Sequence, residues 1–205
     1  MRILVRLLKT LYWACYNIIP VHGNNNTIIG YCKRKIVGNH NTISIGHKSM
    51  LECSITIYGN NNLVKIEDGV VFKSGSIWIE DDNNTVIIGR NTTIENAEIA
   101  VAEGTSISIG NDCMISTGVR IASSDAHSVI NLISQNRINP AKNILVENHV
   151  WIGLRAIICK GVTIGHDSIV GTQSVVTHSI EPNTVVAGNP ATIIKDKVTW
   201  MRERI

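Results

Sequence analysis

His127 is the side chain whose type and position best fit acid–base chemistry. It stands near Asp125 at the start of a long polar stretch that runs from Ala122 to Lys142. Histidine is the natural general base at neutral pH, and a neighbouring carboxylate can orient the imidazole ring. The alternative is a polar loop histidine with no part in catalysis. The local sequence leaves both open.

Motifs of several other chemistries are missing from the sequence. No serine or cysteine lies in a G-x-S-x-G elbow, and there is no phosphate-binding Walker loop, which disfavours hydrolases and phosphotransferases. No two of the seven histidines have metal-ligand spacing with a carboxylate, so we expect no metal. The five cysteines stand singly without C-x-x-C pairs, which favours a reducing compartment. Direct transfer of an acyl group to a hydroxyl needs only a base, oxyanion donors and a donor groove.

A period of six residues organises the chain that must position such a base. The apolar residues that define it are Val146, Ile152, Ile158, Ile164, Val170 and Val176. Neither a helix nor a single strand sustains a period of six. Glycine follows three of them, and small or aliphatic residues occupy the fourth position after them. The pattern predicts a triangular coil of short strands, stacked in parallel around a buried apolar column.

A looser form of this period occupies the earlier part of the chain. Asn-rich turns precede the apolar strands, and successive coils start 21 or 22 residues apart. Asn and Gly tolerate left-handed backbone conformations, which explains why they gather at the expected corners. The residues expected to point inward are Ile45, Leu51 and Ile57, then Ile66, Phe72 and Trp78, then Ile88, Ile94 and Ala100, then Ile109, Ile115 and Ile121.

Three segments depart from the period. Residues 123–145 predict an extruded loop, and long loops on rigid repeats usually carry function. Residues 1–20 predict an amphipathic helix, which caps the coil or contacts a subunit, or alternatively binds a membrane surface through residues 1–17. Residues 21–205 then form one domain. The basic tail after Lys195 predicts a short C-terminal helix.

The net charge of +3, with no basic run, argues against nucleic-acid binding.

Three motifs resemble a known family. They are Asn148-His149-Val150-Trp151-Ile152-Gly153, the hexads through Gly171-Thr172-Gln173-Ser174-Val175-Val176, and Ala187-Gly188-Asn189-Pro190-Ala191. Together they resemble the hexapeptide-repeat O-acetyltransferases. The resemblance implies an all-β fold, a left-handed parallel β-helix.

Within that family, the separation of 24 residues from His127 to Trp151 is similar to that in galactoside and in capsule sialic-acid O-acetyltransferases. The run Arg137-Ile138-Asn139 and the Asn-rich early coils favour the second group.

The resemblance also implies a site. His127 would be the general base on a sugar hydroxyl, and Trp151 would shape the acceptor pocket. Acetyl-CoA would lie between neighbouring subunits of a homotrimer. The positions that match the family's CoA contacts are Leu154, Thr172, Thr177, His178, Pro190 and Lys195. At position 178 relatives often carry lysine, and at position 154 a small polar residue is common in the family. His178 and Leu154 would therefore make weaker side-chain contacts to CoA, but the backbone N–H donors of the coil would remain.

We therefore expect an acetyl-CoA-dependent O-acetyltransferase that acts on a bacterial surface carbohydrate, with capsular sialic acid or polysialic acid as the best match. We expect it in the cytoplasm, at the inner face of the membrane if its N-terminal helix binds there. The alternatives are another glycan, namely an O-antigen, an exopolysaccharide or a nucleotide-linked amino sugar, and a non-catalytic β-helix scaffold. No threonine ladder recurs from coil to coil, which disfavours an ice-binding scaffold.

Overall fold

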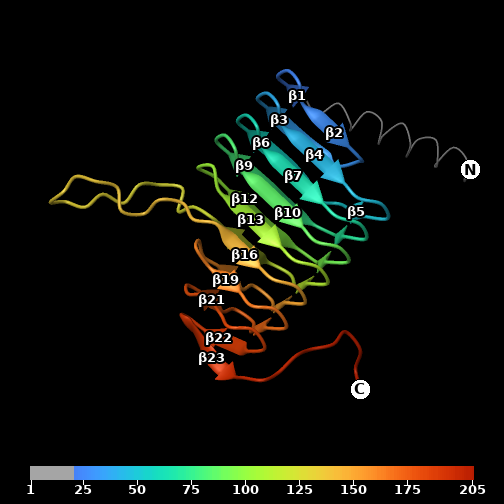
Figure 1. Ribbon diagram of the computed structural model, residues 1–205, viewed down its shortest axis with the longest axis vertical. Helices are drawn as coiled ribbons and strands as arrows, with labels where there is room; N and C mark the ends of the chain where they lie inside the picture. The colour runs from blue at the N-terminus through green and yellow to red at the C-terminus, as the bar shows by residue number, and fades with distance from the viewer. Residues whose placement is uncertain (1–20) are drawn as a thin grey trace, which may run out of the picture.

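The computed structural model describes residues 21–205, which wind into a long coil of short strands (Figure 1). Three sheets run along the coil, and from the third strand to the twenty-first the chain passes from one sheet to the next in strict rotation. Residues 21–205 contain no helix long and apolar enough to cross a membrane. The helix expected within residues 1–20 lies outside the described residues.

The strands of each sheet stack in parallel, which confirms the predicted β-helix. Sheet A contains β1 (Val21–His22), β3 (Lys33–Val37), β6 (Ser54–Tyr58), β9 (Gly75–Glu80), β12 (Ala97–Val101), β15 (Val119–Ala122), β18 (Ile157–Ile158) and β21 (Val175–Val176). Sheet B contains β2 (Thr27–Ile29), β4 (Thr42–Ile45), β7 (Leu63–Ile66), β10 (Thr85–Ile88), β13 (Ser106–Ile109), β16 (Ile144–Val146) and β19 (Thr163–Ile164). Sheet C contains β5 (Met50–Leu51), β8 (Val71–Phe72), β11 (Thr93–Ile94), β14 (Met114–Ile115), β17 (Trp151–Ile152), β20 (Ile169–Val170), β22 (Val185–Gly188) and β23 (Ala191–Lys195), the last of which is antiparallel to β22.

The core is the predicted apolar column. Its strictest part consists of Val146, Ile152, Ile158, Ile164, Val170 and Val176, each at most 1% exposed. These residues come from sheets B, C and A in turn, so each side of the triangle supplies one inward side chain per coil. Side chains of this kind stabilise a fold by roughly 1.5–3 kcal/mol each when they are fully buried. The hexad prediction is confirmed.

The prediction that Trp78 and Ala100 point inward is wrong. Trp78 is 42% exposed, and its neighbours Ile77 and Ile79 fill the core instead. Phe72 pairs with Leu51 and Ile77 pairs with Ile55, so this coil has one more residue at its corner than the coil before it. A shift of one residue moves every side chain of a strand to the other face. Ala100 pairs with Trp78 and follows it outward.

The Asn-rich corners do more than turn the chain. Asn61 and Asn83 adopt the predicted left-handed conformation, with φ of 57° and 61°. The next residues in sequence, Asn62 and Asn84, are buried. The Asn84 backbone N–H donates to the Asn62 side-chain oxygen at 2.8 Å, and the Asn62 N–H donates to Asn41 at 2.9 Å. This ladder satisfies corner N–H groups that would otherwise be buried without a partner.

The basic tail is an extended strap, so the predicted C-terminal helix is wrong. Trp200 is 7% exposed, and its indole N–H donates to the His149 carbonyl oxygen at 2.8 Å. The Arg202 guanidinium bonds the Asp112 carboxylate at 3.0 Å, far back along the coil. Val198 is half-buried, whereas Thr199 and Met201, which flank Trp200, are exposed. This alternation has the period of two of an extended chain, which turns Val198 and Trp200 towards the coil.

Residues 123–143 leave the coil between β15 and β16 and form the long hairpin that projects from the stack in Figure 1. An antiparallel bridge joins Ile130 to Arg137. The tip residues Leu132 and Ile133 are 88% and 96% exposed. The hairpin therefore carries an apolar tip away from its own coil.

Glu103 clamps the base of this hairpin to the coil. Its carboxylate accepts two hydrogen bonds from the Arg137 guanidinium, both at 2.7 Å, and one from the Ser124 hydroxyl at 2.8 Å. The Arg137 contact is the main cause that lowers the pKa of Glu103 from 4.5 to about 2. Because the folded pKa is the lower one, this contact stabilises the fold fully above the unfolded value near 4.5, and the contribution is lost as the pH falls towards 2.

We expect Glu103→Gln to loosen the hairpin at neutral pH. Without the carboxylate the Arg137 side chain loses its charged partner, and the peptide bond after it should become about tenfold more sensitive to trypsin through local opening. The measurement is the rate of appearance of the fragment that ends at Arg137. Glu98→Gln is the matched control, because it removes the partner of Arg120 on the coil itself. Equal cleavage of both variants and the parent would contradict the clamp.

Candidate active site

His127 lies at the base of the hairpin and is exposed. Its carbonyl oxygen accepts a hydrogen bond from the Asn139 amide at 2.8 Å, and the same amide donates to Asp125 at 2.8 Å. The Lys160 ammonium contacts Asp125 at 2.5 Å and the Asn139 carbonyl oxygen at 2.9 Å. Lys160 is the first cause of the lowered pKa of Asp125. Asp125 therefore orients the backbone that carries His127, and its carboxylate is engaged by these two residues.

Trp151 opens β17 on the outer face of sheet C and is 37% exposed. Its ring lies 6.3 Å from the ring of Trp200, so the C-terminal strap packs beside it. Among residues 21–205, no hydrogen bond or ring contact joins His127 to Trp151. The two residues lie in different parts of the coil, since His127 follows a strand of sheet A and Trp151 belongs to sheet C. A single chain does not bring them together.

Leu154, Thr172 and Pro190 lie in successive turns along the edge that follows sheet C, and all three are exposed. The Gln173 N–H donates to the Leu154 carbonyl oxygen at 2.7 Å, which ties the first two turns together. A Cβ at Gly153 would lie 2.8 Å from the Thr172 backbone nitrogen. Glycine there lets the two turns stack closely. The structure thus groups three of the six residues predicted to contact CoA.

The other three predicted contacts lie apart from that edge. Thr177 and His178 follow β21, and the Thr177 hydroxyl is 2.9 Å from the His178 Nδ1. Lys195 is the last residue of β23 and is exposed. Within the described residues, none of these three side chains contacts the turns that contain Leu154 and Thr172. Only an extended ligand could therefore reach all six residues.

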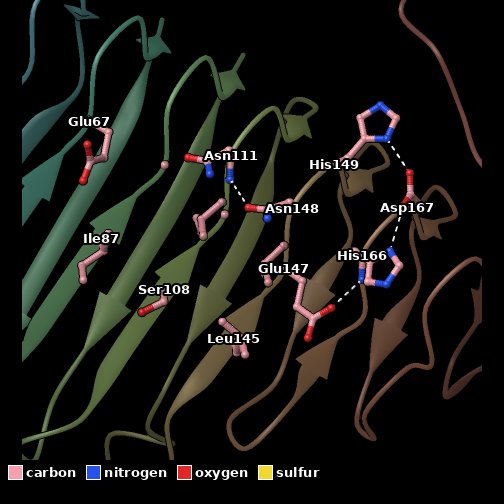
Figure 2. A pocket seen from close by; sticks show the side chains of 14 residues that line it. Glu67, Ile87, Ser108, Asn111, Leu145, Glu147, Asn148, His149, His166 and Asp167 are labelled. Atoms are coloured by element: carbon pink, nitrogen blue, oxygen red, sulfur yellow. Dashed lines mark hydrogen bonds and ion pairs between the residues drawn. The ribbon is translucent and has the colours of Figure 1, made fainter.

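A cavity of about 700 Å³ lies on sheet B and on the corner that leads to sheet C (Figure 2). In the figure His149 and His166 both point to Asp167, and each imidazole Nδ1 is 2.7 Å from that carboxylate. The His149 contact, then the His166 contact, lowers the pKa of Asp167 to about 2. The His149 ring also stacks on Trp200, with 4.2 Å between centroids. These contacts fix the corner and the strap.

None of the predicted site residues lines this cavity. The sequence offered two weak signals for the cluster, namely the adjacent pair His166-Asp167 and the tryptophan in the tail. Neither has a recognisable spacing to His149. Among the described residues, no group of three His, Cys, Asp or Glu is arranged to hold a metal ion.

Comparison with known proteins gives relatives over much of the chain. A polysialic acid O-acetyltransferase of Escherichia coli O1:K1 / APEC is 38% identical over 67% of this chain, and one of Neisseria meningitidis is 37% identical over 62%. The chain covers 42% and 59% of these relatives, less than two thirds of the length of either. No family model matches the chain.

Solved structures match more of the fold. The polysialic-acid-specific acetyltransferase NeuO is 34% identical with a TM-score of 0.81, over 90% of this chain and 89% of its own. The polysialic acid O-acetyltransferase OatWY is 34% identical with a TM-score of 0.83, over 90% and 91%. A galactoside acetyltransferase in complex with coenzyme A is 26% identical with a TM-score of 0.53, over 65% and 64%. The chain therefore belongs to the hexapeptide-repeat O-acetyltransferase family, and within it resembles the polysialic acid O-acetyltransferases.

Proposed function

We propose that the protein transfers an acetyl group from acetyl-CoA to a hydroxyl of polysialic acid. The observation that carries the proposal is the match to two polysialic acid O-acetyltransferase structures over about nine tenths of the chain. The placement of His127 supports it, because a general base must be accessible and yet held by a rigid scaffold. The clamp of Glu103 and the contacts of Asn139 and Lys160 supply that rigidity.

In the proposed reaction, the His127 imidazole takes the proton of the sugar hydroxyl as its oxygen attacks the thioester carbonyl. The carbon–sulfur bond then breaks, the acetyl group stays on the sugar oxygen, and the proton passes from the imidazole to the departing thiolate. No acyl-enzyme is formed, so no serine or cysteine nucleophile is required. Trp151 would shape the acceptor pocket and help position the acetyl group.

The donor would lie along the edge formed by the turns of Leu154, Thr172 and Pro190, with Thr177, His178 and Lys195 contacting its outer parts. The separation of His127 from Trp151 within one chain supports a site shared between subunits. The exposed apolar tip of the hairpin supports the same arrangement, because Leu132 and Ile133 have no cover on their own coil. We therefore propose a homotrimer in which each hairpin reaches a neighbouring subunit.

We expect His127→Ala to reduce turnover roughly 10²- to 10⁴-fold, the usual contribution of a positioned base. The fold should persist, because the side chain is exposed and packs no core. The measurement is thiol release from acetyl-CoA in the presence of polysialic acid. His47→Ala, an exposed histidine at another corner, is the matched control and should keep full turnover. Near-normal turnover of His127→Ala would show that another group is the base.

Lys195→Ala should raise the KM for acetyl-CoA and leave kcat nearly unchanged. A cation that contacts the phosphates of the donor binds substrate and transition state equally, so its loss weakens binding alone. Lys197→Ala, two residues further along the exposed tail, is the control. Repeating the KM measurement with 3′-dephospho-acetyl-CoA tests whether Lys195 contacts the 3′-phosphate of the donor. An equal loss with both donors would argue against a contact to the 3′-phosphate.

The shared site predicts complementation between two inactive variants. Thr172→Trp should block the donor groove, and His127→Ala removes the base. Mixed at equal amounts and reassembled at random, the two chains should recover about a quarter of wild-type activity if base and groove come from different subunits of a closed ring.

Light scattering should give a mass near three chains for the wild type. Each variant reassembled with itself should stay inactive. A stable and fully active monomer would exclude both the shared site and the role given to the hairpin.

A further inference from the structure

On the outer face of sheet A, near the base of the hairpin, an exposed tryptophan lies beside two much smaller side chains. Strand register places Trp78, Ala100 and Ala122 in one column of adjacent outward positions. The large indole is thus followed by two residues that carry only a methyl group. The result is a hollow that is lined by the exposed Trp78 and, beside it, by the small side chain of Ala100.

This hollow is a cavity of about 350 Å³ that reaches the hairpin. Glu80 and Glu98 line it together with Arg120, and Ser124 and Ala126 close it on the hairpin side. Ala126 immediately precedes His127. The cavity therefore extends from the neighbourhood of the proposed base to Trp78, which lies two strands away, or about 10 Å along the coil axis at the usual strand spacing.

The tryptophan is held in place while part of its surface faces water. Its ring lies 5.3 Å from the ring of Tyr58 in a tilted arrangement, and its indole N–H points to the Glu80 carboxylate at 3.4 Å. The Lys35 ammonium lies 4.9 Å from the centre of the Tyr58 ring, at the far end of the same surface. An oriented aromatic side chain that remains 42% exposed is a ready platform for a ligand.

The groups around Trp78 match the surface of a sugar ring. A pyranose presents C–H groups on its faces and hydroxyls around its edge, so it can stack on an aromatic side chain while carboxylates accept its hydroxyl hydrogens. Arg120 gives one N–H to Glu98 at 2.8 Å, and the other guanidinium N–H groups have no partner among residues 21–205. They can donate to a hydroxyl or to the carboxylate of an acidic sugar.

Other ligands fit this surface poorly. The strands β9, β12 and β15 are each paired on both sides, so no free edge exists for an added peptide strand. Glu80 and Glu98 line the cavity, and burying their carboxylates under an acyl chain would cost the hydration of both groups.

We propose that this cavity is an accessory saccharide subsite, which holds a pyranose ring of the acceptor chain away from the ring that is acetylated, with Trp78 as its stacking platform. The proposal rests on the proposed function, because it extends the acceptor site of the same reaction. Such a subsite makes long acceptors better substrates than single sugars, since it adds binding energy only when the chain reaches Trp78.

The kinetic test compares sialic acid oligomers with the single sugar as acceptors. Trp78→Ala should raise the KM for the oligomers about tenfold with kcat unchanged, and should leave the KM for the single sugar unchanged. Trp78→Phe, which keeps a ring, should restore most of the oligomer affinity. Val37→Ala, an exposed apolar residue on the same sheet outside the cavity, should change neither acceptor. An equal rise for oligomer and single sugar, or no rise for either, would overturn the subsite.

Direct binding separates this proposal from the reaction itself. In the His127→Ala background, calorimetry should detect oligomer binding that Trp78→Ala weakens about tenfold, without any acetyl transfer. If the wild type fails to use acetyl-CoA, the proposed function is lost but this measurement still decides the subsite. Oligomer binding that is equal with and without Trp78, or no binding to either protein, would refute it.

Discussion

Each coil depends on hydrogen bonds to the coils directly before and after it. Within the sheets the strands supply these bonds, but at the corners the backbone turns away and its N–H groups need other partners. Asparagine and aspartate side chains fill this need, as when the Asn39 N–H donates to the Asn60 side chain at 2.9 Å and the Asn60 N–H donates to the Asp82 carboxylate at 2.7 Å. The stack is therefore a set of polar ladders around an apolar column. One extra residue at a corner changes which side chains enter that column, as it does for Trp78.

The rigidity of this stack explains how an exposed hairpin can hold His127, the proposed base, in place. His127 makes no core contact, but the segment around it is fixed by charged bonds to coil residues on both sides. Glu103 lies in the corner between β12 and β13, and Lys160 follows β18, so two different coils hold the hairpin. The coil fixes the position of His127, and the hairpin extends beyond the coil surface. Functional loops on repeat folds typically combine these two properties.

The sequence predicts the coil well because the hexad is a local pattern. Val146 to Val176 repeat without insertion, so each apolar residue predicts the next, and the structure buries all of them. The earlier coils contain corners of unequal length, and no local pattern shows where the extra residue falls before Trp78. The helix predicted for the tail is wrong for a related reason. Trp200 and Arg202 are ordered by partners about 50 and 90 residues away, which a basic composition does not reveal.

The candidate site likewise has a part that the sequence predicts, on the regular hexads, and a part that it does not, in the hairpin. The family spacing places Leu154 and Thr172 in adjacent turns, because both are counted along an unbroken hexad. The network of Glu103, Asp125, Arg137, Asn139 and Lys160 joins residues up to 35 apart across an irregular segment, and no sequence period relates them. The roles of His127 and Trp151 rest on resemblance, since neither contacts the other within one chain.

The last strand has a consequence for how the stack ends. A coil of parallel strands exposes an open edge at its final turn, onto which another chain could add strands in the same direction without limit. In sheet C, β23 reverses and covers β22 in the antiparallel sense, with Ala187 opposite Thr192. Continued growth in the parallel register is therefore blocked on that side, as edge strands in natural proteins generally require. The turn around Pro190, which joins β22 to β23, thus gives sheet C an end onto which a further parallel coil cannot be added directly.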